Sequence, residues 1–269
     1  MIGVFDSGLG GLTIFKGLLK ELPDYNYIYL GDNARVPYGG RSDEIIYRYT
    51  KQAVDFLFSQ GCQLVILACN TATSVALRHL QREYLPLTYP QRRILGVIRP
   101  AVEVAVELSF NNRIGVIGTD ATVNSGAFKR ELKKIRSNFK VFQQACPLLV
   151  PIIEAGELKW KGLDLILDKY LASLKRKDVG ALILGCTHYG LIKDKIQQHI
   201  GKKVRIISEE EILPAKLQDY LWRHPEIEKK IPRGRKTRYL ATSYSQRFRE
   251  LTSLFLGKKV EFEVVDIDK

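Results

Sequence analysis

Two copies of one short pattern constrain the fold of this chain more than any other feature. Residues 64–71 read LVILACNT, and residues 181–188 read ALILGCTH. A continuous aliphatic run bounded by small and polar residues is typical of a strand that is buried on both faces. Cys69 and Cys186 therefore lie just past the carboxyl ends of two central strands, which is where open α/β sheets bind their ligands.

A second pair of segments repeats at nearly the same distance. The offset between the two cysteines is 117 residues (186 − 69), and that between IGVFDS at 2–7 and IGVIGT at 114–119 is 112 residues (114 − 2). Two matched pairs at similar offsets predict two related halves. Strands alternate with helices throughout, which favours parallel sheets. We therefore expect an α/β fold of two similar domains, with mainly parallel sheets in a pseudo-two-fold arrangement around a central cleft.

The predicted domain boundaries follow from the order of these elements. Residues 1–93 and 208–269 are expected to form the first domain and residues 94–207 the second. A strand at 94–97 is expected to open the second domain, after a polar link that Pro86 and Pro90 punctuate.

Composition excludes several classes of protein. The chain has 269 residues, of which 45% are hydrophobic and 26% are charged, as in an ordinary globular protein. No run of about 18 apolar residues is present, so no transmembrane helix is expected. The N-terminal residues lead directly into a strand and do not resemble a signal peptide, so we expect a cytoplasmic protein.

The four cysteines show no C-x-x-C pair and no spacing typical of zinc sites. No metal site is therefore predicted, and in a reducing compartment the thiols are expected to be free. Cys62 and Cys146 are interpreted as small buried hydrophobic residues.

The net charge of +13 raises the question of a nucleic-acid partner. Residues 229–238, KKIPRGRKTR, carry six positive side chains and no acidic one. A basic segment can contact phosphates, but this one has no interleaved aromatic residues and belongs to no known nucleic-acid motif. A solvated surface loop is the favoured interpretation, and a non-catalytic role in binding nucleic acid is kept as an alternative.

The cysteine motifs suit acid/base chemistry at a carbon atom of a small carboxylate-bearing ligand. Each cysteine precedes a predicted helix, whose N-terminal N–H groups favour a thiolate. Donors on Asn70, Thr71 and Thr187 are placed to hold a carboxylate and a developing enolate. Two thiols that approach one cleft from opposite sides can remove a proton from one face of a carbon and return it on the other.

His188 follows Cys186 by two residues and is interpreted as a group that orients this thiol or protonates a substrate. A Cys–His hydrolase is the competing chemistry, but it leaves Cys69 and its matching motif unexplained.

Six motifs together give the chain a resemblance to the glutamate racemases of the aspartate/glutamate racemase family. The matching segments are GVFDSGLGG at 3–11, GD at 31–32 with RVPYG at 35–39, ACNTAT at 68–73, GTDATVNS at 118–125, CP at 146–147 with VP at 150–151, and LGCTHY at 184–189. The resemblance implies a cofactor-independent interconversion of L- and D-glutamate, which supplies D-glutamate for bacterial peptidoglycan synthesis. It also implies two α/β domains and a homodimer.

The resemblance assigns roles to individual residues. It implies that Cys69 and Cys186 are the two acid/base residues, one for each face of the α-carbon. Asp6, Glu154 and His188 correspond to supporting polar residues near the thiols. The positions that correspond to substrate contacts are Asp6, Ser7, Tyr38, Gly39, Asn70, Thr71, Thr187 and His188.

Three positions depart from the family pattern. The family usually has proline at Gly190, an acidic residue at Arg99 and aspartate at Ile207. Aspartate racemase shares the two-thiol plan and is kept as an alternative within the same class of enzyme.

Overall fold

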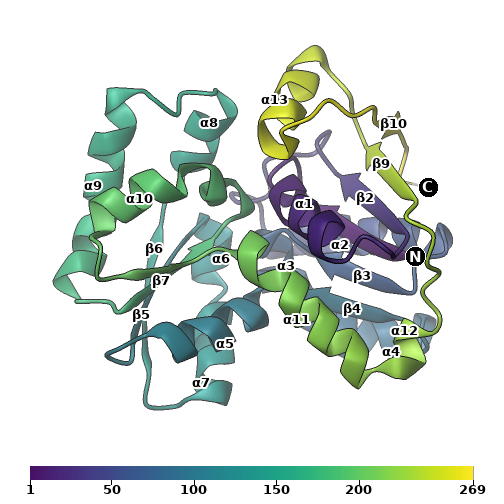
Figure 1. Cartoon of the computed structure of the whole chain (residues 1–269), viewed down its shortest axis with the longest axis horizontal. Coiled ribbons are helices and arrows are strands. Elements are labelled where there is room, and N and C mark those ends of the chain that lie inside the picture. Colours follow the sequence, from purple (N-terminus) through teal and green to yellow (C-terminus); the bar gives the residue numbers. More distant parts are fainter. Residues whose placement is uncertain (269) are drawn as a thin grey trace.

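The computed structural model describes residues 1–268, which form two sheets flanked by helices (Figure 1). Neighbouring strands in both sheets are parallel. The first sheet has the order β10-β9-β2-β1-β3-β4. Its strands are β1 (Ile2–Asp6), β2 (Tyr27–Gly31), β3 (Leu64–Leu67), β4 (Arg93–Gly96), β9 (Thr237–Ala241) and β10 (Glu263–Val264). The second sheet has the order β6-β5-β7-β8, with β5 (Arg113–Gly118), β6 (Lys140–Ala145), β7 (Ala181–Gly185) and β8 (Arg205–Ile207).

The two sheets share one strand order. The segment β2-β1-β3-β4 of the first sheet corresponds to β6-β5-β7-β8 of the second, so β1 is equivalent to β5 and β3 to β7. These are the strands that the repeated sequence segments predicted to be equivalent. The predicted α/β class with two parallel sheets and two related halves is therefore confirmed.

The helices cover both faces of each sheet. Around the first sheet and the junction lie α1 (Gly11–Glu21), α2 (Asp43–Ser59), α3 (Asn70–His79), η1 (a π-helix, Leu80–Tyr84), α4 (Leu85–Thr88), α11 (Glu209–Arg223), α12 (Pro225–Glu228) and α13 (Gln246–Leu256). Around the second lie α5 (Ile98–Leu108), α6 (Asp120–Asn124), α7 (Ala127–Ile135), α8 (Leu149–Glu154), α9 (Lys161–Arg176), η2 (a 3₁₀ helix, Thr187–Ile192) and α10 (Lys193–Ile200). Within residues 1–268, no helix is long and apolar enough to cross a bilayer.

The central strands are buried on both faces because helices pack on each side. Every residue of β1, β3 and β7 is buried, as the uninterrupted aliphatic runs predicted. In β7, Leu182 and Leu184 pack in the core under α9 and α10, whereas Ile183 packs under α5 and α7. This alternation follows from the two-residue period of a strand.

The strand expected to open the second domain belongs to the first sheet. β4 pairs with β3 over its whole length, with Ile94 beside Val65. The expectation was wrong because β4 is the equivalent of β8 and closes the first set of four strands. The chain crosses to the second sheet only after β4, at the start of α5.

The polar link expected around Pro86 is helical. α4 continues directly from η1, and Pro86 follows the π turn in which the Leu85 N–H bonds the Leu80 carbonyl. Proline lacks an N–H for the regular helical bond, and a π turn lies at the point where it enters the helix.

Candidate functional site

Both motif cysteines face one cleft between the two sheets. The cleft has a volume of about 380 Å³ and is lined from the first half by residues after β1 and β3 and from the second half by residues after β5 and β7. Ten of the predicted site residues line it: Ser7, Tyr38, Gly39, Cys69, Asn70, Thr71, Glu154, Cys186, Thr187 and His188. Parallel strands end at one edge of a sheet, so the motifs that follow them converge there.

Cys69 is the residue that caps the N-terminus of α3. Its sulfur accepts the backbone N–H of Ala72 at 3.5 Å and lies 3.3 Å from Ser7 Oγ. These donors favour the thiolate, but the thiol is only 5% exposed. Burial, followed by the nearby carboxylate of Asp6, raises the pKa of Cys69 to about 11.

Cys186 lies at the end of β7, before the short helix η2. Its sulfur is 3.8 Å from His188 Nδ1, and Nε2 of that ring is 3.0 Å from Glu154 Oε1. Glu154 thus holds the ring that faces the Cys186 thiol. Burial raises the pKa of Cys186 well above its ordinary value, although the His188 backbone N–H opposes the shift. The backbone N–H donors lower the pKa of both thiols, as the sequence predicted, but desolvation raises it by more.

Asp6 is the predicted site residue that does not line the cleft, because it is buried behind the cleft wall. It is 1% exposed, and it accepts hydrogen bonds from the Gly8 N–H at 2.9 Å and from Thr187 Oγ1 at 3.4 Å. Burial raises the pKa of Asp6, while the nearby His188 lowers it. Asp6 therefore joins the β1 turn to the β7 turn across the two halves.

The turn after β1 approaches the turn after β7 so closely that Gly10 has no room for a side chain. A Cβ atom on Gly10 would lie 2.1 Å from Thr187 Oγ1 and 2.6 Å from His188 Nδ1. Glycine at this position therefore allows the two halves of the cleft to meet.

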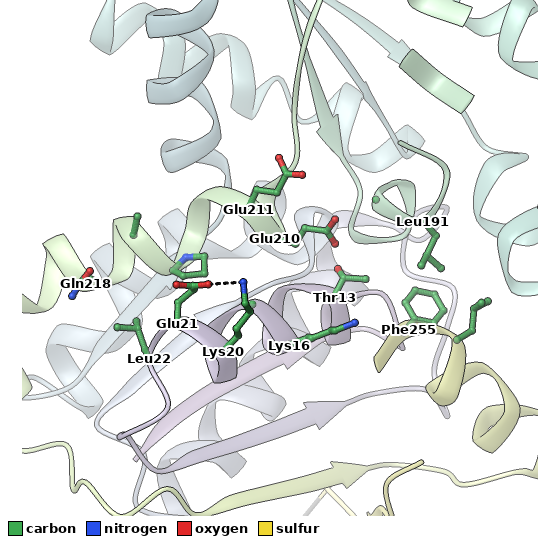
Figure 2. A pocket seen from close by; sticks show the side chains of 15 residues that line it. Thr13, Lys16, Lys20, Glu21, Leu22, Leu191, Glu210, Glu211, Gln218 and Phe255 are labelled. Atoms are coloured by element: carbon green, nitrogen blue, oxygen red, sulfur yellow. Dashed lines mark ion pairs between the residues drawn. The ribbon is translucent and has the colours of Figure 1, made fainter. Parts of the chain in front are cut away.

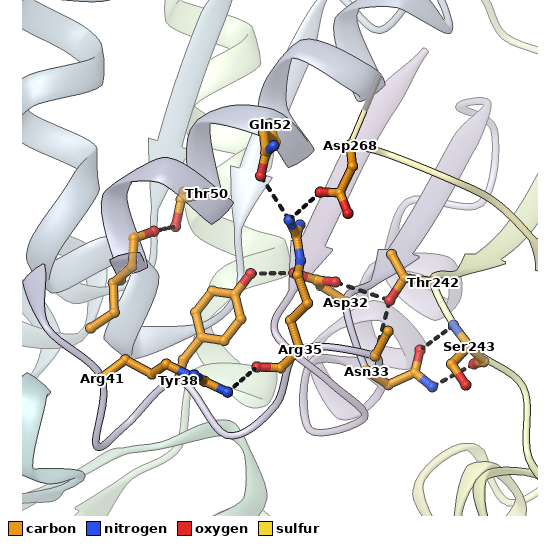
Figure 3. A network of polar contacts seen from close by, with 12 residues as sticks. Asp32, Asn33, Arg35, Tyr38, Arg41, Thr50, Gln52, Thr242, Ser243 and Asp268 are labelled. Carbon is orange, nitrogen blue, oxygen red and sulfur yellow. Dashed lines mark hydrogen bonds and ion pairs between the residues drawn. The ribbon is translucent and has the colours of Figure 1, made fainter. Parts of the chain in front are cut away.

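The loop that carries Tyr38 and Gly39 is held by a buried carboxylate (Figure 3). Asp32 is fully buried, accepts hydrogen bonds from Arg35 Nε at 2.7 Å and Thr242 Oγ1 at 2.9 Å, and is also bonded by the Tyr38 hydroxyl. Burial raises the pKa of Asp32, while Tyr38 and Arg35 lower it. At the tip of the loop, the Gly39 carbonyl accepts the N–H of Ala121, so the loop reaches the second half.

The sequence interpretation missed several residues of the cleft, among them Thr119 and Cys146. Thr119 lines it, and its hydroxyl lies 3.0 Å from that of Thr71. In the repeat, Thr119 is the equivalent of Ser7, and this correspondence was a usable signal. Cys146 also lines the cleft, although it is buried as predicted. Its place after β6 was not evident, because β6 lacks the aliphatic run of β3 and β7.

A larger cavity lies between α1, α11, η2 and α13, with a volume of about 670 Å³ (Figure 2). Its wall includes Lys16, Glu210 and Phe255, together with the Lys20–Glu21 ion pair. None of the predicted site residues lines it. Size alone therefore does not mark the functional site of this chain.

The basic segment 229–238 is largely paired with acidic residues of the same chain. Three of its arginines form ion pairs: Arg233 with Glu228, Arg235 with Asp24 and Arg238 with Glu263. The arginine at 233 also lies over the ring of Tyr25. The positive charge is thus partly neutralised locally. The segment is not a loop throughout, because Thr237 and Arg238 begin β9.

Comparisons with known proteins agree with this geometry. The family model described as Asp/Glu/Hydantoin racemase matches residues 3–213. A glutamate racemase of Persephonella marina is 39% identical over 270 residues, which covers 100% of this chain and 98% of that protein. The structure of glutamate racemase isoform RacE1 from Bacillus anthracis superposes with a TM-score of 0.90 at 30% identity, covering 99% of this chain and 97% of that one. That of Francisella tularensis glutamate racemase in complex with D-glutamate gives a TM-score of 0.87 at 33% identity, with the same coverage.

Proposed function

The chain is a racemase of the Asp/Glu/Hydantoin racemase family, and we propose that it interconverts L- and D-glutamate without a cofactor, with Cys69 and Cys186 as the acid/base pair. The observation that carries this proposal is the placement of both thiols, from equivalent strands of the two sheets, in the wall of one cleft. A hydrolase that needed a single Cys–His pair would not require the second thiol.

The proposed reaction uses one thiolate and one thiol, and the numbers of protons and charges are conserved. The thiolate of one cysteine removes the α-proton from one face of the amino acid, and the C–H electron pair moves into the carboxylate as an enolate. The thiol of the other cysteine gives its proton to the opposite face and becomes a thiolate. In the reverse direction the two residues exchange roles. General acid/base catalysis contributes about 10²–10⁴-fold, so donors that bind the enolate must contribute much of the rest.

The surrounding residues have complementary roles in this proposal. Ser7, Asn70, Thr71 and Thr187, with the Tyr38-Gly39 loop, supply hydrogen-bonding groups to the substrate. Asp6 and the Glu154–His188 pair support the two thiols.

Proton exchange in heavy water tests the reaction directly. Incubation of the protein with L-glutamate in D₂O, with no added cofactor, is expected to give D-glutamate that carries deuterium at the α-carbon. Racemisation without deuterium, or no racemisation, contradicts the proposal. The same assay with L-aspartate distinguishes a glutamate racemase from an aspartate racemase. Faster turnover of aspartate than of glutamate would assign the chain to the second activity.

We propose further that the D-glutamate supplies peptidoglycan synthesis in the cytoplasm and that the protein is a homodimer, as the family resemblance implies. Growth of a bacterium that requires D-glutamate, after expression of this chain, tests the first statement. Light scattering on the purified protein tests the second, and a monomer mass would contradict it.

A further inference from the structure

A buried carboxylate lies behind the cleft and is not used by the proposed reaction. Glu209 begins α11, directly after β8 and Ser208, and is only 4% exposed. It lies beside Cys186 and Thr187 in the wall between the cleft and the larger cavity. A carboxyl group in such a place needs a polar partner, since burial of an unpaired acid is costly.

The partner of Glu209 is a residue of the cleft. Glu209 Oε2 accepts a hydrogen bond of 2.7 Å from Asn70 Nδ2, across 139 residues of sequence. Asn70 follows Cys69 and lines the cleft. The bond therefore ties the first residue of α3 to the first turn of α11.

The bond determines which way the Asn70 amide is turned. An asparagine side chain has an acceptor at one end and two donors at the other, and a half-turn about its last bond exchanges them. With Nδ2 held by Glu209, the opposite atom, Oδ1, is buried and has no hydrogen-bond partner within residues 1–268. A buried acceptor without a partner requires an explanation, and a binding cleft supplies one.

We propose that Glu209 is a positioning residue, which fixes the Asn70 side chain with Oδ1 free to accept from the ammonium group of the bound substrate. This orientation differs from the one expected from the sequence, in which Asn70 donates to the carboxylate. This inference rests on the proposed function, because it assigns Asn70 to substrate binding. Glu209 does not line the cleft itself, so its effect passes through Asn70.

The surroundings of Glu209 act on its carboxyl group in opposite directions. Burial raises the pKa of Glu209 well above its ordinary value, while the Asn70 bond lowers it and Asp6 raises it further. In either protonation state Oε2 is an acceptor for Asn70 Nδ2, and Oε1 is buried without a hydrogen-bond partner within residues 1–268. Glutamine has the same shape and also presents an acceptor, so it is a conservative replacement at this position.

The neighbouring glutamates of α11 provide a matched control. Glu210 faces the larger cavity (Figure 2). Glu211 pairs with Lys193, and 54% of its side chain is exposed. Glu211→Gln therefore makes the same chemical change two residues further along α11, at an exposed side chain that pairs with Lys193, and its kinetic constants are expected to match those of the wild type.

The experiment compares kcat and KM for D-glutamate in the wild type, Glu209→Gln, Glu209→Leu, Asn70→Ala and the double variant Glu209→Leu/Asn70→Ala. Loss of one oriented hydrogen bond corresponds to about a tenfold change. We expect Glu209→Leu to raise KM about tenfold with kcat changed less, and Glu209→Gln to restore KM to within about threefold of the wild type. In the Asn70→Ala background, Glu209→Leu is expected to have no further effect.

Three results overturn the role of Glu209: an unchanged KM in Glu209→Leu, an equal loss in Glu209→Gln, or multiplication of the two single effects in the double variant. Thermal unfolding of each variant shows whether it is folded, and Glu209→Ala carries the same comparison if the leucine variant does not fold. A wild type that does not racemise glutamate would instead overturn the proposed function, and this result is distinguishable from the other three.

Discussion

At the scale of single residues, two opposing effects act on the pKa of each thiol in the cleft. N–H and hydroxyl donors around Cys69 favour its thiolate, and burial disfavours it. Burial is the larger effect, so the free protein holds both sulfurs mainly as thiols at neutral pH. The proposed two-thiol reaction needs one thiolate and one thiol at the same time, so ionisation of one cysteine is a condition for turnover in this proposal.

Removal of either sulfur tests the two-base mechanism. Cys69→Ala and Cys186→Ala are each expected to lower kcat for racemisation by about 10²–10⁴-fold or more, since each removes one acid/base group. Cys62 is fully buried in the core under α2, away from the cleft, and provides the control. Cys62→Ala is expected to lose stability but to keep its turnover per folded molecule. Near-normal racemisation in both single variants would reject the mechanism.

The direction of the pH dependence follows from the raised pKa values. Because burial raises the pKa of Cys69 to about 11, the thiolate fraction grows with pH below that value. We expect kcat/KM for L-glutamate to rise between about pH 7 and pH 10, by up to about tenfold per pH unit where one ionisation limits the rate. Ser7→Ala removes a donor to the sulfur and is expected to shift this rise to higher pH. A kcat/KM that falls with pH would contradict the assignment of a thiolate base.

At the scale of elements, short turns after the strands form much of the cleft wall. Where the turn after β1 meets the turn after β7, there is no space for an added side-chain atom. Gly10 meets the η2 turn, whereas a Cβ atom on Gly40 would have no neighbour within 4 Å. Gly10→Ala is therefore expected to displace Thr187 or His188 and to lower kcat/KM at least about tenfold. Gly40 also lines the cleft but has open space for a methyl group, so Gly40→Ala, assayed in parallel, is expected to lower kcat/KM less than Gly10→Ala. Equal activities of the two variants would show that the η2 turn adjusts freely.

The loop between β2 and α2 depends on Asp32 in the same way. Its buried carboxylate joins three partners, one of which, Thr242, belongs to the C-terminal part of the chain. Asp32→Ala leaves Arg35 in place without its buried partner, and we expect the free energy of unfolding in urea to fall by about 3–5 kcal/mol.

Asp268 provides a comparison on the same arginine. It also pairs with Arg35, but 65% of its side chain is exposed. Asp268→Ala is expected to cost less than about 1 kcal/mol, because water screens an exposed ion pair. A loss of similar size in Asp32→Ala and Asp268→Ala would contradict this account of the loop.

At the scale of the whole molecule, the net charge of +13 does not by itself indicate a nucleic-acid partner. The arginines of segment 229–238 pair with the adjacent Glu228 and with Asp24 and Glu263 from other parts of the fold. We expect any binding to duplex DNA at about 50 mM salt to disappear by about 200 mM, as for non-specific contact with phosphates. The paired variant Arg233→Ala/Arg235→Ala is expected to bind with the same affinity as the wild type. Specific, salt-resistant binding that this variant loses would instead support a nucleic-acid role.

The sequence by itself determined the class of fold and the prediction that Cys69 and Cys186 follow equivalent strands. Uninterrupted aliphatic runs that end in a cysteine can be accommodated only as strands covered on both faces, and their repetition implied the equivalence of β1 with β5 and of β3 with β7. Local patterns of this kind can be recognised in the sequence because the burial of a strand is reflected in the types of its own residues.

Only the tertiary structure decided which separate segments meet. The strand at β4 joined the first sheet because strand pairing, and not its own composition, fixes the sheet to which it belongs. Thr119 and Cys146 line the cleft from the second half, and Glu209 accepts a hydrogen bond from Asn70, which is 139 residues away in the sequence. The depth of burial that raises the pKa of both thiols also depends on packing between the halves, and no short stretch of sequence records it.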